Sequence, residues 1–141
     1  MTAAERLADA LRAEHAAIYA YGVLGARLDG QTVSAAQTAE AAHRARRDAV
    51  MVRLAALRAP APPAEPAYAL PAPVPDQAAA LRLMVGVEER CAGIWRQALP
   101  EVTGDDRQLA VDALIDCAVR ATKARTVAGV RPPTVPFPGR Q

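Results

Sequence analysis

Apolar residues recur every three or four positions in four stretches of the chain, a spacing that is typical of amphipathic helices. The stretches cover residues 3–28, 34–58, 76–99 and 105–127. Asp29-Gly30 and Pro100 separate neighbouring stretches, and Asp76 is placed to cap the third. The pattern predicts an all-α protein of four helices. The expected inward positions include Leu7, Leu11, Tyr21, Val50, Leu54, Leu57, Trp95, Leu114 and Ile115.

Residues 59–75 read APAPPAEPAYALPAPVP, and this density of proline excludes a helix or a central strand. In an extended form the segment reaches about 50 Å, further than the roughly 37 Å of a 25-residue helix. The second and third helices can then run parallel. Two antiparallel hairpins joined by one long crossover form the ferritin-like topology. We therefore expect a ferritin-like four-helix bundle over residues 1–128. The proline-rich tail, residues 129–141, is expected to pack on the bundle or on a partner through Phe137.

Composition narrows the classes of partner. Apolar residues make up 52% of the chain and aromatic residues 4%, so alanine-rich helices should pack closely. A net charge of +2 provides no strong field for nucleic acid or anionic lipid, and no apolar run is long enough to span a membrane. The charged N-terminus does not read as a secretory signal, and Cys91 and Cys117 are expected to be buried, reduced thiols. The alanine and arginine bias fits a bacterial source, and the expected location is cytoplasmic.

Carboxylates interrupt the apolar stripes of three predicted helices at Glu14, Glu40 and Glu88. Buried charges must be paired or must bind metal. Glu40 and His43 have the Glu-x-x-His spacing of carboxylate-bridged iron or manganese sites, to which Glu14 and Glu88 would add single carboxylates. The fourth helix contains no histidine, so the second Glu-x-x-His motif of such a site is missing.

Three readings remain open at this point. The preferred one is a metal-free network of Glu14, His15, Tyr21, His43, Arg47 and Glu88, with Arg47 held between Glu14 and Glu88, and with neither a cofactor nor catalytic residues. In the second, Glu14, Glu40, His43 and Glu88 hold iron or manganese in an oxidoreductase or metal-handling protein with a degenerate di-metal site. In the third, a cavity near Gly22, Gly25 and Gly86 binds an unidentified small molecule. The readings leave open whether the chain is an enzyme.

Four segments together resemble a known family: EHAAIYAYG, EAAHRARRDAV, PAEPAYALP and TVPFPG, in this order along the chain. The chain resembles an actinobacterial family of ferritin-like proteins that is catalogued as a domain of unknown function. The resemblance covers nearly the whole chain and implies a bundle that forms a homodimer and has no established activity. Carried over by position, it points to Glu14, His15, Tyr19, Tyr21, His43, Arg44, Arg47, Asp48, Glu88, Glu89 and Trp95. We therefore expect a non-catalytic, self-associating helical module.

Overall fold

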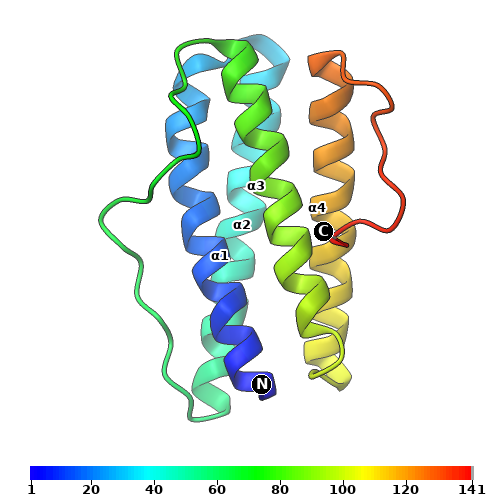
Figure 1. The fold of residues 1–141 in the computed structure, drawn as a ribbon. Helices are drawn as coiled ribbons and strands as arrows, with labels where there is room; N and C mark the ends of the chain where they lie inside the picture. Colours follow the sequence, from blue (N-terminus) through cyan, green and yellow to red (C-terminus); the bar gives the residue numbers. More distant parts are fainter. Residues whose placement is uncertain (141) are drawn as a thin grey trace.

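The computed structural model describes residues 1–140 and consists of four long helices (Figure 1). These are α1 (Ala3–Leu24), α2 (Gly30–Ala56), α3 (Gln77–Ala98) and α4 (Gly104–Ala128), with a short 3₁₀ turn, η1 (Gly25–Arg27), after α1. No strand occurs among these residues. The prediction of an all-α protein is therefore confirmed. No helix within residues 1–140 is long and apolar enough to cross a membrane.

Capping residues explain where three of the helices begin or end. Thr2 and Glu5 form a capping box at the start of α1, and the Asp76 carboxylate accepts a hydrogen bond from the Ala79 N–H at the start of α3. Gly129 ends α4 with a left-handed φ of 75°, which glycine adopts without strain. The second helix begins at Gly30 rather than near residue 34, directly after the turn, so the first hairpin is tighter than predicted.

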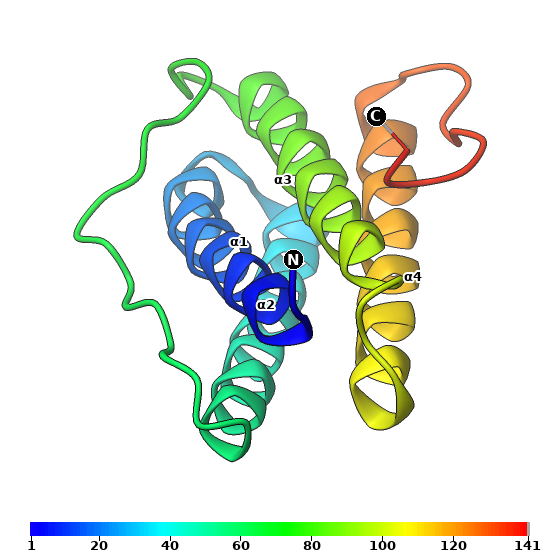
Figure 2. The same cartoon turned by 60° about the horizontal axis from the view of Figure 1, so that its bottom comes forward.

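The helices form two antiparallel hairpins, α1/α2 and α3/α4 (Figure 1). Residues 57–76 connect them along the outside of α1, from one end of the molecule to the other, so that α2 and α3 run in the same direction. Both views place α1 against α2 and α3, and α3 against α4 (Figures 1 and 2). Of the four helix pairs that are in contact, α2 and α4 pack against each other least. The bundle is therefore open along this one side.

The connection is fastened to α1 and η1 at successive levels. His15 Nε2 lies 3.1 Å from the Pro62 carbonyl oxygen, and the rings of Tyr19 and Tyr68 pack with their centroids 5.6 Å apart. Further along, the Arg27 Nε–H donates to a carbonyl of the connection at 3.1 Å. These contacts hold the proline-rich segment as a strap over the bundle.

The interior contains two apolar clusters with polar side chains between them. On α1, Leu7 and Leu11 belong to one cluster, and Tyr21 and Leu24 belong to the other. Glu14 lies between the two clusters and is 0% exposed. On α2, likewise, the polar His43 lies between residues of the two clusters, Ala39 on one side and Val50 on the other. The polar site therefore lies at mid-height in the bundle, out of contact with water.

Helix α4 turns a different face inward from the predicted one. Its fully buried positions are alanines and Cys117, whereas Ile115 is 57% exposed and Val119 is 46% exposed. Leu57 at the end of α2, also predicted to be inward, is 42% exposed. The reason is close packing: α3 carries the larger side chains at the α3/α4 contact, and alanines on α4 let the two helices approach. Ile115 and Val119 are thus left on the surface, whereas Leu109 and Leu114 are partly buried against the core.

The tail folds back onto its own α3 and α4 (Figure 1). Arg96 and Arg125 donate to the carbonyls of Pro138 and Pro133, at 3.1 and 3.2 Å. Gly139 lies directly on the α3 backbone, where a Cβ atom would come within 2.6 Å of a carbonyl oxygen. Phe137 is 64% exposed, so it does not anchor the tail on its own bundle. Backbone carbonyls and a close glycine contact hold the tail instead.

Candidate functional site

His43 is the centre of the buried polar group. Its Nδ1 lies 2.5 Å from Glu14 Oε2, and its Nε2 lies 3.0 Å from Glu88 Oε1. All three side chains are 0% exposed and come from three different helices, α2, α1 and α3. A doubly protonated imidazole donates one N–H to each carboxylate. His43 therefore joins three helices through two charge-assisted hydrogen bonds.

The second oxygen of Glu14 is also satisfied. Its Oε1 accepts hydrogen bonds from Arg46 Nη1 at 3.2 Å and from the Trp95 indole N–H at 2.8 Å. Trp95 is 0% exposed and Arg46 is 9% exposed. Glu14 thus accepts hydrogen bonds from three donors, one each on His43, Arg46 and Trp95. Hydrogen bonds to the charged form stabilise a buried carboxylate as an anion.

Arg46 extends the network to the fourth helix. Its Nη2 donates to Asp116 Oδ2 at 2.7 Å, and Arg120 donates to the same oxygen at 3.0 Å. Arg46 Nη1 also lies 3.6 Å from Cys117 Sγ. The guanidinium therefore bridges Glu14 and Asp116 on the open side of the bundle, between α2 and α4.

Glu88 is satisfied on one oxygen only. The Tyr21 hydroxyl donates to Glu88 Oε1, the oxygen that also faces His43. Glu88 Oε2 is buried and has no partner within residues 1–140. It is one of two buried side-chain polar atoms without a partner there. This oxygen is the place in the network where a further cation or donor could bind.

The electrostatics favour a charged network. Burial lowers the pKa of His43, but the hydrogen bonds and charges of Glu14 and Glu88 outweigh it and raise the pKa from 6.5 to about 10. Burial raises the pKa of Glu14, and His43, Arg46 and Trp95 more than reverse this, so its pKa lies below the usual value. Burial and the Glu88 charge raise the pKa of the Tyr21 hydroxyl, which therefore stays protonated. At neutral pH His43 is an imidazolium between two carboxylates.

The two cysteines lie at the edge of this network. Cys91 is 2% exposed and Cys117 is 0% exposed, and both are free thiols. Contact with the Cys117 thiol, and then burial, raise the pKa of the Cys91 thiol well above its usual range. One ligand atom each of Glu14, His43 and Cys91 lie within 4.8 Å of one another. Cys91 is thus a poor nucleophile but lies within reach of a metal ion that His43 and Glu14 could bind.

The structure brings together Glu14, Tyr21, His43 and Glu88 from the predicted set and places the other three elsewhere. Glu40 is half-buried on the outer side of α2 and pairs with Arg44 at 2.9 Å, so the Glu-x-x-His pair does not point into one site. Arg47 pairs with its exposed neighbour Asp48, and His43 occupies the place between Glu14 and Glu88 that was predicted for Arg47. His15 is buried but holds the strap. The corrections for Glu40 and Arg47 have one cause: α2 is rotated so that Ala39 and Arg46 face the core instead.

Sequence reasoning did not place Arg46, Asp116 or Cys117 in the network. Arg46 stands beside Arg44 and Arg47 in an arginine-rich stretch, a pattern typical of a solvated helix face. The alanine stripe of α4 is the signal that could have placed Asp116 and Cys117. Asp116 adjoins the buried positions 113 and 117 of that stripe.

The comparisons with known proteins agree with this architecture. The crystal structure of a conserved hypothetical protein, rv2844, from Mycobacterium tuberculosis is similar to this chain, with a TM-score of 0.85 and 40% sequence identity. The similarity covers 89% of this chain and 96% of that chain. No curated protein matches the sequence. The family model described as Domain of unknown function (DUF4439) matches residues 6–141. The chain therefore belongs to this family of uncharacterised domains.

Proposed function

We propose that the chain is a ferritin-like, non-catalytic helical module that self-associates, and that its buried polar network fixes the positions of the helices without metal. The observation that carries this proposal is His43, both of whose ring nitrogens pair with buried carboxylates. A ferritin-like metal centre uses metal ions to neutralise inward carboxylates. Here an imidazolium and the Arg46 guanidinium supply the positive charge beside Glu14 and Glu88.

Charge balance supports the metal-free form. With His43 protonated, its charge and that of Arg46 offset those of Glu14 and Glu88, so these side chains carry no net charge. A divalent ion would displace a proton from His43. It would also be repelled by the Arg46 guanidinium, which lies at hydrogen-bond distance from Glu14. The site would reach neutrality again only if the Cys91 thiol also lost its proton. Metal binding therefore requires two deprotonations in a buried site.

Elemental analysis of the purified, tag-free protein tests this proposal, as isolated and after anaerobic loading with iron(II), manganese(II) or zinc(II). We expect well below one ion per chain under each condition, because His43 and Arg46 already neutralise the charges of Glu14 and Glu88. About one tightly held ion per chain would contradict the metal-free reading. Cys91→Ser should then abolish binding and Glu40→Gln, on the outer side of α2, should leave it unchanged.

A metal-binding protein is the second candidate, and the unpaired oxygen of Glu88 favours it. The ion would be held by Glu14, His43 and Cys91, with Glu88 as a further carboxylate ligand. This mixture of nitrogen, thiolate and carboxylate donors suits zinc or iron(II) better than manganese(II). A metal there would act as a Lewis acid or a redox centre. Glu40 takes no part in this donor set.

The proposed self-association rests on the outward face of α4. Ile115 and Val119 are exposed, lie one turn apart and form the centre of an apolar stripe. Asp112 and Lys123 stand near its two ends on the same face. When two copies of α4 pack antiparallel about a two-fold axis, Ile115 of each meets Val119 of the other and Asp112 comes opposite Lys123. Charge and shape thus both suit a second copy of this chain.

Substitution of both apolar residues by aspartate tests this interface. We expect Ile115→Asp with Val119→Asp to convert a dimer to a monomer in sedimentation velocity, because the two-fold axis places new like charges opposite each other. The helix content should not change, since both positions are exposed. Val52→Asp, at an exposed position of α2, is the matched control and should leave the mass unchanged. A wild-type protein that is monomeric at all concentrations would contradict self-association.

A further inference from the structure

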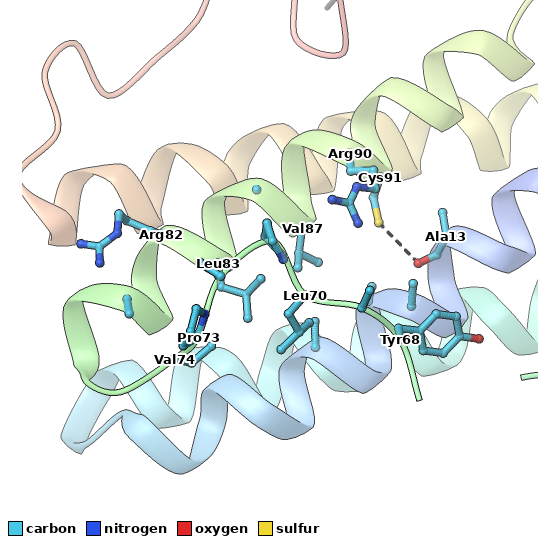
Figure 3. A pocket seen from close by; sticks show the side chains of 18 residues that line it. Ala13, Tyr68, Leu70, Pro73, Val74, Arg82, Leu83, Val87, Arg90 and Cys91 are labelled. Atoms are coloured by element: carbon cyan, nitrogen blue, oxygen red, sulfur yellow. Dashed lines mark hydrogen bonds between the residues drawn. The ribbon is translucent and has the colours of Figure 1, made fainter. Parts of the chain in front are cut away.

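A cavity of about 350 Å³ lies under the strap, between α1 and α3 (Figure 3). Its walls are small or apolar: alanines of α1, the segment Tyr68–Val74 of the strap, and residues of α3 from Ala79 to Cys91. The α3 wall has a rise of about 18 Å. The volume lies in the range of ligand sites. Because it extends along this length of α3, the cavity is narrow and elongated.

The cavity is held open rather than left by loose packing. The strap is fastened by His15, Tyr19 and Arg27 on the α1 side, as described above, so it cannot collapse freely onto α3. Gly86 faces the cavity from α3, and a Cβ atom built on it would meet no atom within 4 Å. Alanines form the opposite wall on α1. The alanines of α1 and Gly86 of α3 therefore leave a space that the neighbouring side chains do not fill.

The charge on the cavity wall has one sign. Arg82 and Arg90 are the only charged residues that line it, and Figure 3 places Arg90 beside Cys91 at one end and Arg82 toward the other. Both are exposed, and neither makes a side-chain hydrogen bond or ion pair within residues 1–140, unlike Arg96 and Arg125 on the same side of the chain. No carboxylate lines the cavity. An anionic group at either end would therefore find an unpaired guanidinium.

We propose that this cavity binds a long-chain carboxylate of the fatty acid class, with its apolar chain under the strap and its carboxylate on Arg90 or Arg82. The apolar walls and the elongated shape fit a hydrocarbon chain, and a guanidinium binds a carboxylate through two parallel N–H donors. Cys91 lies between this cavity and the His43 network, but the proposal uses neither His43 nor its carboxylates and does not depend on the function proposed above.

Fluorescence of cis-parinaric acid, a polyene fatty acid that brightens in an apolar site, provides the test. We expect saturable binding to the full chain and displacement by oleate, at concentrations below those at which oleate self-associates. Oleyl alcohol, which has the same chain without the charge, should displace at least about tenfold more weakly. Replacing both arginines, Arg82→Gln with Arg90→Gln, should remove this preference and leave displacement by the alcohol unchanged.

A cavity-filling variant locates the site. Gly86→Leu should abolish binding while keeping or raising the melting temperature, because leucine favours the helix and the space is empty. Gly22→Leu is the matched control, since Gly22 is an exposed helical glycine of α1 outside the cavity and should bind as the wild type does. Absence of saturable fluorescence, equal displacement by acid and alcohol, or undiminished binding by Gly86→Leu would each overturn the proposal.

Discussion

Replacing His43 with alanine is expected to lower the free energy of unfolding by about 3–5 kcal/mol. The imidazolium separates Glu14 and Glu88, neither of which is exposed to water. Without it, two buried carboxylates face each other across the bundle and lose their shared donor, and a cavity is left behind. Urea unfolding followed by circular dichroism at pH 6 measures the change, because His43 is fully protonated at that pH.

The other histidine of the chain is the matched control. His15 is buried to a similar extent but makes a single hydrogen bond, to the Pro62 carbonyl of the strap. His15→Ala should therefore cost only about 1 kcal/mol. Equal losses for the two substitutions would show that His43 is an ordinary core residue, and the network would then not be the element that holds the helices in register.

The four helices could be predicted from the sequence because their signals are local. Apolar spacing, the cap at Asp76, the break at Pro100 and the proline-rich segment each depend on a few neighbouring residues. The rotation of α4 could not be predicted in this way. Its sequence offers two stripes, one of alanines and one that contains Ile115 and Val119, and hydrophobicity favours the second. Close packing against α3 selects the first, and this is a tertiary effect.

The same limit explains which site residues were found. Glu14, His43 and Glu88 stand at the centre of the inward faces, so a small error in helix rotation does not move them out of the core. Arg46 and Arg47 lie on opposite flanks of the same face, about 100° apart. Only the position of Asp116 on α4 decides between them, because its carboxylate lies on the Arg46 side. The same rotation of α2 turns Ala39 toward the core and leaves Glu40 half-buried on the outer side.

Stability is expected to fall as the pH rises from neutral to about 10, and His43 gives the sign. Its pKa is 6.5 when the chain is unfolded and about 10 in the folded protein, so its contribution is fully present below pH 6.5. Between these values the unfolded chain loses the proton that the folded protein keeps, and the contribution disappears as the pH passes about 10. This difference corresponds to a contribution on the order of 5 kcal/mol.

Glu14 gives the opposite slope in acid. Its pKa is lowered in the folded protein, so its contribution is present above its ordinary value of 4.5 and is lost as the pH falls below it. Both contributions come from the same Glu14–His43 ion pair, so the two free energies must not be added together. Maximum stability is therefore expected between pH 4.5 and 6.5.

Free energies of unfolding from urea titrations at a series of pH values test the alkaline slope. His43→Gln keeps a polar side chain of similar size but carries no charge, so its profile should be nearly flat where the wild type declines. Every other titratable group is present in both proteins, so the difference between the two profiles isolates the contribution of His43. His15→Gln should retain the wild-type slope. A wild-type profile that stays level from pH 6.5 to 10 would mean that His43 is neutral when buried, and the charge balance that disfavours a metal ion would no longer hold.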